Sequence, residues 1–153
     1  EYLADLSAWY GENVDKRFMH FRAELLYILN QESALMEIVK LIGSDVLPDE
    51  QKLILDISRV IRVGFLQQNA FHAEDTYVPL IKQFKMMEII LYLYEKAKLL
   101  VNIGIPMSVL NADGIWNRII NIKYDVPNNK LEMFDNYKQD IDRFYSSISE
   151  KHA

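Results

Sequence analysis

The fold of this chain is decided by one stretch, 79-PLIKQFKMMEIILYLYEKAKLLVN-102. Its apolar residues recur at helical spacing, which predicts a helix over residues 79–102 that ends before Gly104. They cover most faces of that helix: Leu80, Ile81, Phe84, Met87, Ile90, Leu91, Tyr94 and Leu99. A helix that is apolar nearly all round is buried, so this one is expected at the centre of a bundle.

Amphipathic helices are predicted on both sides of the central helix. The first covers residues 3–10. The second begins near Asp15, resumes its pattern after Asn30 and stops at Gly43, a usual helix-ending residue. The third begins at Pro48, which suits the first position of a helix, and runs to about residue 68. Short helical turns are expected at residues 106–110 and 114–123, and a last helix from residue 131 onward.

The apolar stripes of these helices define the expected core. They carry Phe18, Phe21, Leu25, Ile28, Leu29, Leu35, Ile38, Val39, Ile42, Leu53, Ile57, Val60, Ile61, Leu131, Phe134, Ile141, Phe144 and Ile148. The pattern predicts an all-α fold, a helical bundle of about five to seven helices. Because no long linker interrupts it, residues 1–153 are expected to form a single helical domain.

Composition narrows the range of functions. Half of the 153 residues are hydrophobic, the net charge is −5 and no basic patch stands out, which disfavours nucleic acid and anionic membranes as partners. The chain has no cysteine, so disulfides and thiolate chemistry are excluded. The longest apolar run, residues 89–94, falls well short of the ~18–20 residues that span a bilayer. We interpret the chain as a fragment of a longer protein and expect it in the cytoplasm without direct membrane insertion.

Catalytic and metal-binding patterns are missing from the sequence. The glycines are isolated, so there is no glycine-rich phosphate loop, and there is no nucleophile pattern. His20 and Glu24 stand four residues apart on one predicted helix, a spacing more typical of a solvated face than of a metal site. A bundle metalloenzyme would need Glu-x-x-His pairs, and the chain has none. The acidic residues Glu132, Asp135, Asp140 and Asp142 are expected on the wet face of the last helix.

The stretch 65-FLQQNAFHAEDTY-77 is an unusual way to end a helix. Two aromatic residues enclose neutral amides and one small residue. Aromatic faces stack on nucleobases for ~1–3 kcal/mol per base, and amides can pair with the edge of a base. The stretch is therefore consistent with a purine-binding segment. The alternative is a helix end with ordinary polar caps.

Several segments, taken in order, resemble the C-terminal helical domain of the catalytic A subunit of V-type and A-type rotary ATPases. They are Trp9-Tyr10 with residues 12–14, residues 41–43 followed by 47–50, the segment 65–72, and residues 75–80. The resemblance extends over roughly residues 6–124 and is strongest over 38–94. The final helix, from Leu131, does not align with the family pattern by inspection.

The resemblance implies a nucleotide site. In the intact parent chain, Phe65, Gln68, Ala70 and Phe71 would form the adenine pocket. The phosphate loop and the residues that bind Mg²⁺ would lie upstream. ATP and Mg²⁺ therefore belong to the parent subunit, whereas this fragment carries no cofactor or catalytic residue of its own. The fragment alone is expected to be inactive.

The resemblance implies a second site at the tip of a helix–loop–helix. There the residues Ser44, Asp45, Val46, Leu47, Pro48, Asp49 and Glu50 would contact the rotating central stalk. The expected partners are the non-catalytic B subunits and the central stalk subunits of the same complex, together with ATP and ADP. Such a complex couples ATP hydrolysis or synthesis to H⁺ or Na⁺ transport and is peripheral on the membrane. A stand-alone helical interaction module remains the alternative, and it predicts a large exposed apolar patch.

Overall fold

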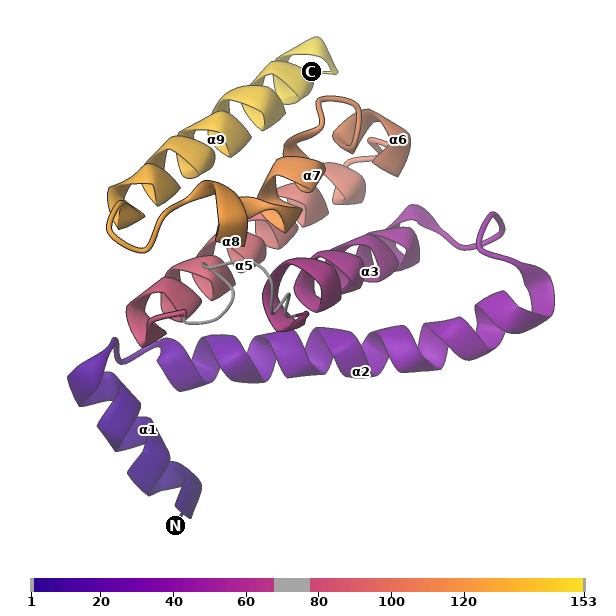
Figure 1. Ribbon diagram of the computed structural model, residues 1–153. Coiled ribbons are helices and arrows are strands. Elements are labelled where there is room, and N and C mark those ends of the chain that lie inside the picture. The colour runs from indigo at the N-terminus through magenta and orange to yellow at the C-terminus, as the bar shows by residue number, and fades with distance from the viewer. Residues whose placement is uncertain (1, 68–77, 153) are drawn as a thin grey trace.

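A computed structural model describes residues 2–67 and 78–152 (Figure 1). Within these residues the chain is helical and contains no strand, which confirms the all-α prediction. The α-helices are α1 (Tyr2–Asn13), α2 (Phe18–Ile42), α3 (Asp49–Arg59), α5 (Leu80–Asn102), α6 (Met107–Leu110), α7 (Ile115–Ile120), α8 (Ile122–Asp125) and α9 (Phe134–Lys151). A π-helix, η1 (Val60–Leu66), continues α3, and a 3₁₀ turn, η2 (Leu131–Met133), precedes α9. No described helix is long and apolar enough to cross a bilayer.

The helix α5 lies at the centre, as its sequence predicts. In Figure 1 it runs between α2 and α3 on one side and α9 on the other, and it contacts all three. Leu93 and Ala97 are fully buried at its middle, and Phe84 is buried near its start. Most faces of α5 thus enter the core, whereas Ile81 and Leu99, which the apolar pattern also included, are 41% and 62% exposed.

The helices α2 and α3 form an antiparallel hairpin. Gly43 ends α2 with φ 84°, and its N–H donates to the Val39 carbonyl at 2.8 Å. A left-handed φ of this kind favours glycine because it has no Cβ. Pro48 caps α3 from one position before its first residue, and Asp49 and Glu50 occupy the first turn, where carboxylates stabilise the helix dipole.

The start of α2 is held against α5. The Asp15 carboxylate accepts a hydrogen bond from the Arg17 backbone N–H at 2.8 Å, but Arg17 is the N-cap residue, no side chain caps α2, and the helix begins three residues after Asp15, at Phe18. The Arg17 guanidinium lies over the rings of Phe21 and Phe84 and forms an ion pair with Glu88 at 3.3 Å. These contacts join α2 to α5 at one end of the bundle.

The third predicted helix differs from the observed one at its end. The α-helical winding stops at Arg59 and continues as a π-helix, in which the Gln67 N–H donates to the Arg62 carbonyl at 2.8 Å. Gly64 lies against α7 in this segment, and a Cβ on it would lie 3.1 Å from both Cα and O of Ile120. The apolar pattern predicts helical winding, but it does not predict this close approach between two distant segments.

The last helix packs on α5 with a stripe that differs partly from the predicted one. Phe134, Ile141 and Ile148 are buried as expected, together with Tyr137 and Tyr145, whereas Phe144 is only partly buried.

The acidic residues of this region divide into two groups. Glu132 and Asp135 are exposed, as expected. Asp140 instead pairs with Arg118 at 2.7 Å, and Asp142 accepts a hydrogen bond from the Tyr92 hydroxyl. These two carboxylates therefore link α9 to neighbouring helices.

Candidate functional site

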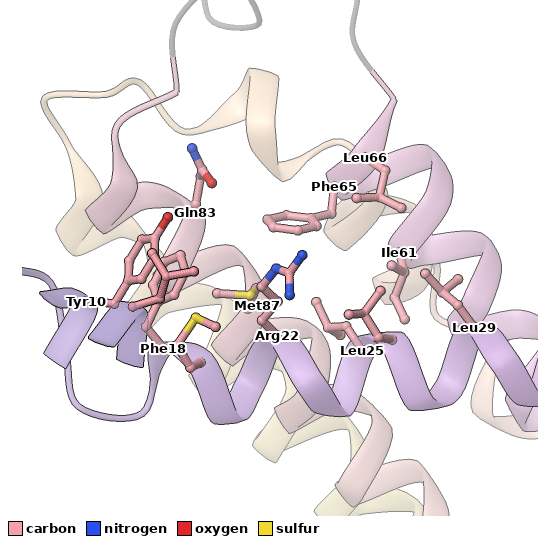
Figure 2. A pocket seen from close by; sticks show the side chains of 13 residues that line it. Tyr10, Phe18, Arg22, Leu25, Leu29, Ile61, Phe65, Leu66, Gln83 and Met87 are labelled. Carbon is pink, nitrogen blue, oxygen red and sulfur yellow. The ribbon is translucent and has the colours of Figure 1, made fainter. Parts of the chain in front are cut away.

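An open cavity of about 440 Å³ lies between the N-terminal half of α2, the end of η1 and the start of α5 (Figure 2). Its volume falls within the range of ~300–1,000 Å³ that is usual for small-molecule sites. Apolar side chains form most of its wall, including Leu25 and Ile61. The polar groups at its edge come from Tyr10, Arg22 and Gln83. An apolar cavity with a few polar groups at its edge suits a flat ring that has a polar edge.

Phe65 is the residue of the aromatic-amide segment that enters this cavity. It is the second-to-last residue of η1, and Figure 2 shows its ring projecting into the cavity on the same side as the Arg22 guanidinium. The ring is partly buried and leaves one part accessible. The other residues predicted for the adenine pocket, Gln68, Ala70 and Phe71, lie outside the described residues.

Arg22 is a cavity residue that the motifs in the sequence do not single out. It stands four residues after Phe18 and three before Leu25, both buried, so a cation occurs within the apolar stripe of α2. That interruption is the signal from which it could have been found. Arg22 is exposed, and its planar cationic group can stack on an aromatic ring or pair with an anion. Gln83 adds an amide, whose Nε2 donates to the Val78 carbonyl at 3.0 Å.

The second predicted site, residues 44–50, lies at the tip of the α2–α3 hairpin. Val46 is 61% exposed, and the adjacent end of α2 presents Leu41 and Ile42 at 85% and 60%, so the expectation that Ile42 belongs to the core is wrong. Leu47 instead is buried. We refer to Leu41, Ile42 and Val46 as the apolar tip. The tip therefore offers apolar side chains for contact in addition to acidic ones.

Acidic side chains line the other side of the same tip. Asp45, Asp49 and Asp56 face a surface cavity of about 480 Å³ that also borders Met107. Asp49 accepts a hydrogen bond from the Met107 N–H at 3.3 Å, so it ties the tip to α6. Burial raises the pKa of Asp56 above its ordinary value, against the opposing hydrogen bond from Asn111.

Metal-binding groups do not gather anywhere in residues 2–67 and 78–152, where no cluster of three or more potential ligands occurs. His20 and Glu24 do lie 3.0 Å apart, as their spacing predicts. Both side chains are largely exposed to solvent, so the pair is a surface contact.

The family match and the similar proteins all point to the same protein family. Residues 7–107 match the family described as the C-terminal domain of V and A type ATP synthase. The V-type ATP synthase alpha chain 2 of Clostridium tetani is 42% identical over 152 residues, which is 99% of this chain and 26% of that protein. The V-type ATP synthase alpha chain of Halothermothrix orenii is 41% identical, with the same coverage of both chains. The A subunit of the A-type ATP synthase of Methanopyrus kandleri is 37% identical over 98% of this chain and 25% of its own length.

The chain therefore belongs to the family of C-terminal domains of V- and A-type ATP synthases. In the relatives this domain is part of the polypeptide named the alpha chain or the A subunit. The chain spans about a quarter of the length of those relatives. The relatives also align with α9, the helix that the resemblance alone did not include.

Proposed function

We propose that this chain closes the adenine side of the ATP site in the catalytic A subunit of an ion-translocating V/A-type ATPase, and that its hairpin tip contacts the central rotor stalk. The observation that carries the proposal is the position of Phe65. In a chain of this family, the described part of the aromatic-amide segment borders a cavity of small-molecule size.

The residues around Phe65 suit an adenine ring and do not suit a triphosphate. The cavity wall is apolar, and its aromatic face and the nearby guanidinium can both stack on a base. The chain has no glycine-rich phosphate loop. Mg²⁺ and the phosphates of ATP are accordingly assigned to the upstream part of the parent chain, where chemistry at the γ-phosphate would occur. The role of Phe65, with Gln68, Ala70 and Phe71, is to bind and orient the base.

The rotor contact is supported by the shape and stiffness of the hairpin. The helix α2 has 25 residues, so at a rise of ~1.5 Å per residue it reaches from the cavity to the tip, about 37 Å. The Arg62 guanidinium on η1 pairs with the Glu32 carboxylate on α2 at 2.7 Å, which joins the two arms. A displacement at the cavity end is thereby transmitted to the apolar tip, and a two-state element of this kind can be biased from either end.

The proposed partners are the central stalk at the tip and the non-catalytic B subunits elsewhere on the head. The proposed location is the cytoplasmic side of the membrane, peripheral to it, with H⁺ or Na⁺ as the transported ion. The exposed apolar tip is also what a stand-alone interaction module would present. Relatives that carry this domain within a chain about four times as long favour the role in the ATPase.

The test is a comparison of Phe65→Leu with the parent protein in the full-length chain, assembled into its complex. Leucine keeps the site apolar but removes the aromatic face, which stacks on a base for ~1–3 kcal/mol. The expected result is a KM for ATP raised roughly five- to hundredfold. The affinity for inorganic tripolyphosphate, which lacks a base, should not change. An unchanged KM for ATP would overturn the assignment of Phe65 to the adenine pocket.

A further inference from the structure

The two walls of the Phe65 cavity are joined behind it by one short segment. Phe65 belongs to η1 and Gln83 to α5, and these elements are separated in sequence by the residues outside the described ranges. Gln67, close to Phe65, and Lys82, next to Gln83, are each hydrogen-bonded to the segment that contains α8. That segment lies beyond residue 107, where the family match ends.

Lys123 holds the end of η1. Its Nζ donates to the Gln67 carbonyl at 2.6 Å, and Lys123 as a residue is only 2% exposed. Gln67 is the residue that follows the π-helix and already has an extended backbone. A cation at this position pairs with a carbonyl at the helix end and interacts favourably with the helix dipole.

Lys82 holds the start of α5 to the same segment. It is fully buried, and its Nζ donates to the carbonyl of Lys123 at 2.8 Å, to the carbonyl of Val126 at 2.7 Å and to Oδ1 of Asn128 at 2.9 Å. An ammonium group has three donors, so these acceptors are enough to satisfy it. Burying a charge is costly unless it is hydrogen-bonded, which makes this geometry specific.

A third contact fixes η1 from the same side. Gly64 approaches the backbone of Ile120 so closely that a Cβ would lie 3.1 Å from it. The segment of α7 and α8 thus contacts η1 through backbone packing at Gly64 and through the Lys123 hydrogen bond to Gln67. Phe65 lies between these two points, so its direction into the cavity depends on both.

We infer that Lys82 and Lys123 form a lysine bracket with α8 that sets the separation of the two cavity walls, and that both act as positioning residues for the adenine pocket. The inference rests on the proposed function and assigns part of that function to residues after 107. Removing Lys123 Nζ removes the hydrogen bond to the Gln67 carbonyl at the end of η1 and leaves the side chain of Phe65 unaltered. The resulting loss should therefore affect the base and leave the phosphates of the nucleotide unaffected.

The test uses the full-length chain in its complex and compares Lys123→Met with Lys130→Met. Methionine keeps the unbranched apolar stem and removes the donor. Lys130 is exposed and serves as the matched control. Lys123→Met is expected to raise the KM for ATP about five- to tenfold, a coupling of ordinary size between sites. Its kcat and its affinity for tripolyphosphate should stay within about twofold.

One further variant, Asn128→Ala, together with Phe65→Leu makes every outcome decisive. Asn128→Ala removes one of the acceptors of Lys82 and should raise the KM for ATP by about two- to threefold, a modest share of the coupling that links two sites. The KM of Asn128→Ala for ATP still tests the bracket if Lys123→Met fails to assemble into the complex. If Phe65→Leu weakens ATP binding but neither bracket variant does, the bracket is overturned and the proposed function stands. If Phe65→Leu also leaves ATP binding unchanged, the proposed function is overturned together with the inference.

Discussion

Replacing Gly64 by alanine tests the packing between η1 and α7. The added methyl group would lie 3.1 Å from Cα and O of Ile120, closer than ordinary van der Waals contact, and both atoms belong to the backbone. Forcing an extra methyl group into a packed core costs ~1–3 kcal/mol. Alanine returns up to ~1 kcal/mol through its higher helix propensity. With the full ~1 kcal/mol returned, the expected net loss of unfolding free energy is about 0–2 kcal/mol.

The assay is urea unfolding of the 153-residue chain, followed by circular dichroism. With a denaturant slope of roughly 2 kcal/mol per molar urea, the midpoint should fall by up to about 1 M. Gly11→Ala is the matched control, because Gly11 lies within α1 and its added methyl group would meet Lys16 at an ordinary 3.5 Å. That variant should be as stable as the parent or slightly more so. A Gly64→Ala protein at least as stable as Gly11→Ala would refute the close approach of η1 to α7.

Three other expected results follow from the same structure. Changing Leu41 and Val46 to serine should reduce ion transport per ATP hydrolysed several-fold and leave the KM for ATP unchanged. Each of these apolar side chains contributes up to ~1.5–3 kcal/mol to the binding free energy when a partner covers it. ATP-driven pumping in vesicles is the measurement, and a larger effect from Asp49→Ala with Glu50→Ala would contradict the expectation. Burial, with the hydrogen bond to Asp142, raises the pKa of Tyr92 to about 12 from an ordinary 10. The contribution of the protonated Tyr92 to stability is therefore complete below pH 10 and is lost as the pH rises to 12. The phenolate absorbance of the parent minus that of Tyr92→Phe should show a titration near pH 12, and a midpoint near 10 would contradict this expectation. The 153-residue chain alone should bind ATP no more tightly than millimolar in isothermal titration, and micromolar binding of defined stoichiometry would require a phosphate site within it.

The candidate sites can be predicted from the sequence only in part. The aromatic and amide residues that stand together in the chain point to Phe65, and the structure places it at a cavity. Arg22 and Gln83 reach the same cavity from α2 and α5, and nothing local in the sequence indicates that these helices meet there. The tip residues form a contiguous loop, but the burial of Leu47 and the exposure of Leu41 depend on how the loop packs against α6.

Helix positions were determined by the sequence itself. Apolar spacing is a local property, so it predicts the buried α5, the separate helices α2 and α3, and the end of α2 at Gly43. Only the tertiary structure decided the π-helical winding at η1, the burial of Lys82 and the hydrogen bond from Lys123 to the Gln67 carbonyl. The two lysine contacts join segments that lie 41 and 56 residues apart in the chain. A buried ammonium group is stable only when polar atoms satisfy it, and here those atoms come from distant segments that no periodicity along the chain records.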